Sequence, residues 1–198
     1  MTARVAPVEA WVHPTAVIDA GASVGEETRI WHHCHVMSGA RIGRAVMLGQ
    51  GCFVGSGVTI GDRTRIQNHV SVFEGVELES DVFVGPSAVF TNVLRPRAFL
   101  QQEFVRTLVR RGATIGANAT VLPGVEIGEY AFVGAATLVR EDVPPHALVV
   151  GVPGRQIGWV GMHGEKLRIE GGMGVCPVTG ERYRMTPGGP VREPVAGP

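Results

Sequence analysis

The chain of 198 residues carries 18 basic and 18 acidic side chains, so its formal net charge is zero. This balance argues against a nucleic-acid-binding protein or one attracted to an anionic membrane surface. No stretch approaches the ~18 consecutive apolar residues of a membrane span, and residues 1–10 lack the apolar segment of a signal peptide. Three cysteines at unrelated spacings suit a reducing compartment, so we expect a cytoplasmic protein.

An aliphatic residue recurs every six positions after an N-terminal extension over residues 1–11. The residue four places later is small or β-branched, and glycine often follows the aliphatic residue directly. This period fits neither the 3.6 residues of a helix nor the alternation of an ordinary strand. Three flat sides of six residues would close a coil of 18, and stacked coils would bury one continuous core. The sequence therefore predicts an all-β parallel β-helix. The series is Val12, Ile18, Val24, Ile30, Val36, Ile42, Leu48, Val54, Ile60, Ile66, Val72, Leu78, Val84 and Phe90.

The register breaks after Phe90 and resumes at Ile115. The intervening segment 94–112 contains proline, several arginines and large apolar residues, so we expect a loop extruded from the coil. Long loops in a regular scaffold usually carry function. We expect the β-helix to span residues 12–143 and a C-terminal extension and tail to span 144–198, with residues after about Arg184 disordered or loosely attached.

Coils of 18 residues place residues 18 apart side by side, at about 4.8 Å. This stacking predicts columns of outward polar groups. Asparagines in such columns also serve simply as turn residues, a carboxylate as a solvated group and a histidine as a packed ring. One column contains Ser38, Ser56, Glu74 and Asn92, a second contains His32, Gln50, Asn68 and Pro86, and a third contains His35, Phe53, Ser71 and Val89.

Four of the seven histidines, namely His32, His33, His35 and His69, raise the question of a metal, because γ-class carbonic anhydrases share this kind of coil and bind zinc. No histidine pair here has their five-residue spacing, and neighbouring carboxylate ligands are lacking. Cys176 in VCPVTGERY is similar to half of a zinc knuckle, but no second cysteine follows. We therefore predict no metal site.

Several segments resemble one family, the UDP-2-acetamido-3-amino-2,3-dideoxyglucuronate N-acetyltransferases of bacterial O-antigen synthesis. The resemblance covers about Val12 to Trp159 and touches the tail at CPVTGERY. It implies a left-handed β-helix of hexapeptide-repeat acyltransferases. The segments are IWHHCHV, LGQGCFVG, IGDRTRIQNHVSVFEGV, VGPSAVFTNV, RTLVRRGATIGANATV, IGEYAFVGA and VGVPGRQIGW.

The resemblance implies a homotrimer with active sites between neighbouring coils, acetyl-CoA as cosubstrate and a nucleotide-linked amino sugar as acceptor. The family pattern places Asn92 against the acceptor amine and Asn68, Arg97 and Arg110 near the sugar or its phosphates. The chain departs from the pattern at His69, at Leu94-Arg95 and at Phe104-Val105-Arg106, which bears on the identity of the sugar. The coenzyme would run past Gly116, Asn118, Gly134, Ala135 and Arg155.

Acetyl transfer from a thioester to an amine requires a positioned neutral amine and stabilisation of an oxyanion. We expect the amide oxygen of Asn92 to accept a hydrogen bond from the amine and Glu74 to favour its growing positive charge. A histidine base, His32 or His35, is the alternative. We expect N-acetylation of a UDP-2-acetamido-3-amino uronic acid. Alternatives are a dTDP-3-amino-deoxyhexose, a sugar O-acetyltransferase and a non-catalytic scaffold.

Overall fold

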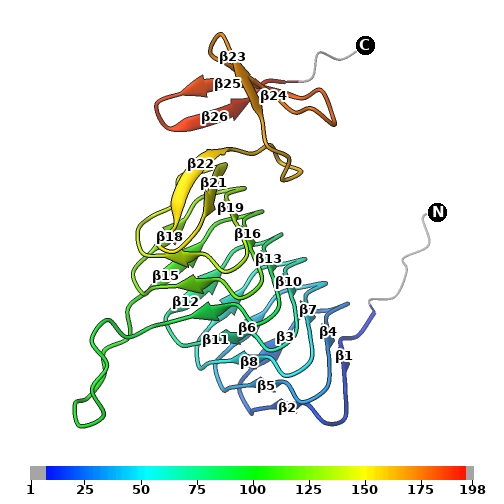
Figure 1. The fold of residues 1–198 in the computed structure, drawn as a ribbon. Coiled ribbons are helices and arrows are strands. Elements are labelled where there is room, and N and C mark those ends of the chain that lie inside the picture. Colours follow the sequence, from blue (N-terminus) through cyan, green and yellow to red (C-terminus); the bar gives the residue numbers. More distant parts are fainter. Residues whose placement is uncertain (1–7, 195–198) are drawn as a thin grey trace, which may run out of the picture.

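The computed structural model describes residues 8–194 and consists of short strands wound into a coil (Figure 1). Successive hexads contribute strands of mostly two residues to three parallel sheets in turn, which we name A, B and C. Pairing joins residues one coil apart, as Trp11 pairs with Arg29 and His35 with Phe53. The predicted all-β parallel β-helix of hexapeptide repeats is confirmed.

Each sheet takes one strand from each successive coil, so neighbouring strands in a sheet come from neighbouring coils. Sheet A consists of β1 (Trp11–Val12), β4 (Arg29–Ile30), β7 (Met47–Leu48), β10 (Arg65–Ile66), β13 (Phe83–Val84), β16 (Thr114–Ile115), β19 (Phe132–Val133), β21 (Ala147–Val150) and the antiparallel β22 (Arg155–Trp159). Sheet B consists of β2 (Val17–Ile18), β5 (His35–Val36), β8 (Phe53–Val54), β11 (Ser71–Val72), β14 (Val89–Phe90), β17 (Thr120–Val121) and β20 (Leu138–Val139). Sheet C consists of β18 (Glu126–Ile127), β15 (Thr107–Val109), β12 (Val76–Leu78), β9 (Thr59–Ile60), β6 (Arg41–Ile42) and β3 (Ser23–Val24).

Two residues of each hexad fill the narrow interior, as the sequence pattern requires. Ile66 and Val70, for example, are completely buried. Some of the small inward residues are polar, and their heads bond to corner carbonyls, as the Thr28 hydroxyl does to the oxygen of Gly43 at 2.8 Å. The interior is therefore largely apolar, and Thr28 is satisfied in this way, whereas the buried hydroxyl of Thr137 has no partner within residues 8–194.

The extruded loop leaves the coil after β14 and returns at β15 (Figure 1, green). Residues 107–112, which the sequence assigns to the loop, instead lie in the coil: Thr107–Val109 is a strand that pairs with β12. Val109 is the missing hexad residue, six positions before Ile115. The expected boundary is too late because the two arginines that follow Val109 are typical of a loop.

The C-terminal extension folds over the end of the coil (Figure 1). β21 and β22 form a hairpin, and a separate antiparallel sheet follows, with Leu167, Cys176 and Tyr183 as its small core. Its strands are β23 (Arg168–Glu170), β24 (Met173–Val175), β25 (Arg182–Thr186) and β26 (Gly189–Arg192). The expectation of a disordered or loose tail after Arg184 is wrong up to residue 194, and the remaining four residues lie outside the described part. Across residues 8–194, no helix is long and apolar enough to cross a membrane.

Candidate functional site

The three corners of the coil differ in how their polar groups are paired. At the corner between sheets C and A, charged side chains pair across neighbouring coils: Arg63 contacts Asp81 at 2.6 Å, and Arg111 reaches the same carboxylate at 3.1 Å. The bond from Arg63 holds the pKa of Asp81 below its usual range. This corner satisfies its own charges, so it offers few free groups to a ligand.

Arg110, predicted to bind phosphate or a sugar carboxylate, lies at this self-paired C–A corner. Its guanidinium contacts Glu126 at 2.8 Å and Glu79 at 3.0 Å. These hydrogen bonds, the Glu126 bond first, raise the pKa of Arg110 further above its ordinary value. The fork that would hold an anion is thus occupied by two carboxylates of the same chain.

Asn92 and Glu74 follow sheet B, on successive coils of the corner between sheets B and C. The amide nitrogen of Asn92 donates to the backbone oxygen of Glu74 at 2.9 Å. A carbonyl can only accept, so this bond fixes which end of the amide turns towards Glu74. Within the described residues, the amide oxygen of Asn92 has no hydrogen-bond partner. The predicted pair therefore lies together, with a free acceptor atom at the corner.

His35 points outward from β5, and its Nε2 lies 3.1 Å from a carboxylate oxygen of Asp19. His32 lies on the same coil, at the corner between sheets A and B, where its ring stacks on His13 at 3.5 Å. Both histidines are three coils away from Asn92, or roughly 14 Å at the usual strand spacing. Within one chain, neither histidine shares a reacting atom with Asn92.

Four of the five positions predicted for the coenzyme, all except Arg155, lie at the A–B corner on the two coils beyond that of Asn92. Backbone bonds stack this corner, from Asn118 to Pro86 at 3.0 Å and from Ala136 to Ala117 at 2.8 Å. The Gly151–Arg155 turn closes over it, because Leu138 donates to the oxygen of Gly151. Arg155 is exposed at the start of β22.

Coil stacking itself explains the residue types at three of these positions. A Cβ at Gly116 would lie 2.4 Å from the backbone nitrogen of Ala135, and one at Gly134 would lie 2.8 Å from Val150. Asn118 has a φ of 56°, a left-handed conformation that asparagine tolerates. The result is a narrow strip of small residues along the corner, with the exposed Ala135 at its surface.

The remaining predicted residues do not converge within one chain. The side-chain oxygen of Asn68 accepts from the backbone nitrogen of Gln50 at 3.0 Å, a coil-to-coil contact at the A–B corner. Arg97 lies in the extruded loop, where its guanidinium donates to the neighbouring carbonyl of Pro96. Asn68, Arg97 and Arg110 thus occupy the A–B corner, the loop and the C–A corner respectively.

Sequence reasoning places Phe53 beside His35 in one column, but it misses Asp19 and Phe73 as neighbours of this pair. Asp19, the partner of His35, lies 16 residues away rather than 18, so a map of columns does not join them. Phe53 meets the His35 ring edge-on at 5.8 Å, and Phe73 lies 5.5 Å from Phe53. A signal for Phe53 is present, because the residue before each inward aliphatic points outward.

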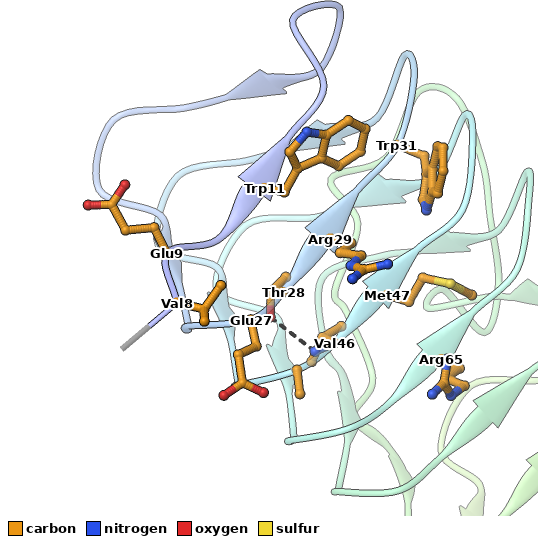
Figure 2. Close-up of a pocket in the computed structure, with 11 residues that line it drawn as sticks. Val8, Glu9, Trp11, Glu27, Thr28, Arg29, Trp31, Val46, Met47 and Arg65 are labelled. Carbon is orange, nitrogen blue, oxygen red and sulfur yellow. Dashed lines mark hydrogen bonds between the residues drawn. The ribbon is translucent and has the colours of Figure 1, made fainter. Parts of the chain in front are cut away.

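A hollow lies elsewhere, on the outer face of sheet A near the N-terminal coils (Figure 2). It measures about 770 Å³ and is lined by Trp11, Trp31, Met47, Arg29 and Arg65, among others. None of the predicted site residues lines it. Elsewhere, Arg155 lines a hollow of about 270 Å³ at the end of the coil. Among residues 8–194, no three His, Cys, Asp or Glu side chains are grouped as a metal site.

Two family models match the repeats. "Bacterial transferase hexapeptide (six repeats)" matches residues 39–74, and "Hexapeptide repeat of succinyl-transferase" matches residues 111–139. The two segments lie on either side of the extruded loop. They identify these two stretches of the coil as repeats of the bacterial transferase type.

Curated relatives are acetyltransferases by name. The chain is 42% identical over 87 residues to the dTDP-3-amino-3,6-dideoxy-alpha-D-galactopyranose 3-N-acetyltransferase of Aneurinibacillus thermoaerophilus, which covers 44% of this chain and 45% of that protein. It is 44% identical over 50 residues to the serine acetyltransferase of Escherichia coli K12, covering 25% of this chain and 18% of that enzyme. The chain thus matches less than half the length of either relative.

Solved structures share the architecture. A GDP-perosamine N-acetyl transferase variant from Caulobacter crescentus, in complex with CoA and GDP-perosamine, aligns with a TM-score of 0.54 at 23% identity, over 77% of this chain and 58% of that one. The acetyltransferase domain of PglB from Neisseria gonorrhoeae aligns with a TM-score of 0.51 at 18% identity, over 76% and 58%. At such identities the likeness concerns the fold, the left-handed β-helix. The chain thus contains hexapeptide repeats of the bacterial transferase type over residues 39–74 and 111–139, and it shares its fold with these solved acetyltransferase structures.

Proposed function

We propose that the protein is an acetyl-CoA-dependent N-acetyltransferase that acetylates the 3-amino group of a nucleotide-linked amino sugar. The observation that carries the proposal is Asn92, whose amide nitrogen is held by the Glu74 carbonyl and whose oxygen has no partner within residues 8–194. Such an oxygen can accept a hydrogen bond from an incoming amine. The relative named as a sugar 3-N-acetyltransferase supports the same reaction class.

The chemistry needs an oriented, neutral amine beside the thioester. The amine nitrogen bonds to the thioester carbonyl carbon, the carbon–sulfur bond breaks and the departing thiolate takes the surplus proton. Asn92 aims the lone pair by holding one N–H. The exposed carboxylate of Glu74, one coil below, stabilises the positive charge that grows on nitrogen during attack.

We place the donor and the acceptor on opposite sides of Asn92 along the coil axis. Acetyl-CoA takes the strip of small residues at the A–B corner, along Gly116, Asn118, Gly134 and Ala135, with its phosphates towards Arg155. That strip presents little side-chain bulk, and an arginine fork suits phosphate. The nucleotide sugar takes the coils towards the N-terminus, where the polar and aromatic residues of sheet B lie.

The acceptor in its finer form is a UDP-2-acetamido-3-amino uronic acid, with Arg97 available for the carboxylate and Asn68 beside the sugar. A dTDP-3-amino-deoxyhexose is the second candidate. Two observations favour it: the relative from Aneurinibacillus thermoaerophilus is named for such a sugar, and Arg110 is already paired with Glu79 and Glu126.

The histidine mechanism is the catalytic alternative. With Asn92 at the amine, the three-coil separation puts His32 and His35 at more remote parts of the same acceptor. We therefore assign both histidines to acceptor binding. Variants at His32 and His35 then serve as the comparison for the Asn92 variant.

We further propose a homotrimer working in the cytoplasm in O-antigen or surface polysaccharide synthesis. On a single chain, no other element within residues 8–194 covers the outer face of sheet B. Phe99 in the extruded loop is 82% exposed, so no side chain of these residues packs over it. Light scattering that reported a stable, active monomer would contradict the trimer.

The test is release of free thiol from acetyl-CoA with a panel of acceptors. The panel contains the UDP-linked 3-amino uronic acid, the dTDP-linked 3-amino-deoxyhexose and the 3-hydroxy analogue of each. We expect kcat/KM for one amino sugar to exceed that of its hydroxy analogue by at least about a hundredfold, because a hydroxyl is a weaker nucleophile than an amine and needs a general base that the Asn92 amide cannot supply. Equal rates for amine and hydroxyl would replace the proposal with O-acetylation, and no release from any acceptor would contradict it.

A further inference from the structure

An aromatic cluster lies on the outer face of sheet B, on the N-terminal side of Asn92. Phe53 points outward from β8, and Phe73 lies at the B–C corner of the next coil, directly before Glu74. Their ring centroids are 5.5 Å apart with an interplanar angle of 50°. The His35 ring meets Phe53 edge-on at 5.8 Å and an angle of 78°. Three rings on three adjoining coils thus form one continuous patch.

This patch is accessible and differs from the rest of its sheet face. Phe73 remains 38% exposed, and the His35 side chain is 43% exposed. The patch is also oriented: Asp19 holds His35 through a contact of 3.1 Å. The other outward positions of sheet B are aliphatic, serine or threonine, at Val17, Ser71, Val89, Thr120 and Leu138.

We propose that Phe53 and Phe73, with His35 at their edge, form the subsite for the nucleobase of the acceptor. The inference rests on the proposed function, which puts the amine of the sugar at Asn92. A diphosphate and a pentose separate the sugar from the base, so the base must lie some coils away from Asn92. Phe53 and His35 lie two and three coils below, or roughly 10 and 14 Å.

The aromatic side chains of the patch favour a nucleobase as the bound group. Every nucleobase offers a flat π-face, and stacking on aromatic side chains holds bases with little dependence on their identity. UDP and dTDP both carry a pyrimidine, so the assignment holds for either acceptor. The donor strip offers no comparable surface, because its corner consists of residues such as Gly116, Ala117 and Ala135.

The experiment measures UDP and dTDP binding by titration calorimetry, together with steady-state kinetics. The variants are Phe53→Leu and Phe73→Leu, and the matched control is Phe83→Leu, which alters a ring as exposed as Phe73, 38%, on the outer face of sheet A. We expect each sheet B variant to weaken nucleotide binding by about tenfold and to raise KM for the nucleotide sugar equally. The kcat, the KM for acetyl-CoA and the control should stay unchanged.

A Phe53→Tyr variant should restore binding, because it keeps the ring. If Phe53→Leu lowers the thermal unfolding temperature, nucleotide binding is compared between wild type, Phe53→Tyr and Phe73→Leu instead. Unchanged nucleotide affinity in both leucine variants would overturn the subsite, as would a rise in KM for acetyl-CoA alone. Nucleotide binding that depends on Phe53 in a protein that acetylates no sugar would support the subsite and overturn the proposed function.

Discussion

For individual residues, an 18-residue period is enough to predict some neighbours and not others. It places Glu74 beside Asn92, which the hydrogen bond between them confirms. It cannot place Arg110, because Glu79 pairs with it across the inserted loop, 31 residues away, and Glu126 pairs diagonally, 16 residues away. An arginine that the sequence predicts to bind an anion is therefore paired with carboxylates of its own chain.

Replacing Asn92 separates the amide mechanism from the histidine mechanism. We expect Asn92→Ala to lower kcat by roughly a hundredfold, since a lost hydrogen bond to a charged reacting group costs on the order of 2–3 kcal/mol. Binding of acetyl-CoA should change little. His32→Asn and His35→Asn should instead raise KM for the sugar and keep the acidic limb of the pH–rate profile, which reports the amine losing its proton.

Steady-state kinetics of the three variants across pH makes the comparison. An Asn92→Ala enzyme near wild type, beside a histidine variant that has lost the acidic limb, would transfer the role of base to that histidine.

At the scale of strands and sheets, the coil can be predicted because every hexad requires two inward-facing residues. The C-terminal sheet cannot be predicted in this way. Its core rests on Leu167, Cys176 and Tyr183, which follow no period and come together only through antiparallel pairing. The loop boundary fails for a related reason: Val109 obeys the hexad, but Arg110 and Arg111 after it resemble loop residues until their partners on other coils are known.

Attachment of the C-terminal sheet to the coil should depend on pH through His146. This ring is buried between Tyr130 and Tyr183, and its Nδ1 lies 3.0 Å from the oxygen of Val160. Burial lowers its pKa below the ordinary 6.5, although the Val160 bond and Glu129 oppose the shift. Because the folded pKa is the lower one, the protein loses stability as pH falls below about 6.5 towards it.

Thermal unfolding and hydrogen exchange of residues 160–192 at about pH 7.5 and about pH 5, on either side of the ordinary histidine pKa, measure this effect. His146→Asn should reduce the difference between the two pH values, since asparagine does not titrate and tolerates the φ of 60°. The control is His69→Asn, an exposed corner histidine with a φ of 59°, which should leave the difference intact. An equal pH dependence in wild type and His146→Asn would remove His146 as the cause.

Over the full length of the molecule, the stacked coils of the β-helix place side chains at regular intervals along one axis. In the proposed arrangement the donor strip, Asn92 and the aromatic patch follow one another in that order along the coil. Under the proposed function, we expect the choice of sugar to depend on the loop, where the guanidinium of Arg97 donates only to the neighbouring Pro96 carbonyl within residues 8–194.

Acetyl transfer to nitrogen at position 3 of a nucleotide-linked sugar is the step on which the proposed function depends. Nuclear magnetic resonance of the product identifies the acetylated atom, using wild-type protein, acetyl-CoA and the 3-amino nucleotide sugar that gives the fastest thiol release. We expect a single acetyl group in amide linkage at C3, one per thiol released, and slower formation in Asn92→Ala. An acetyl ester on a hydroxyl, or thiol release without an acetylated sugar, would contradict the proposed function.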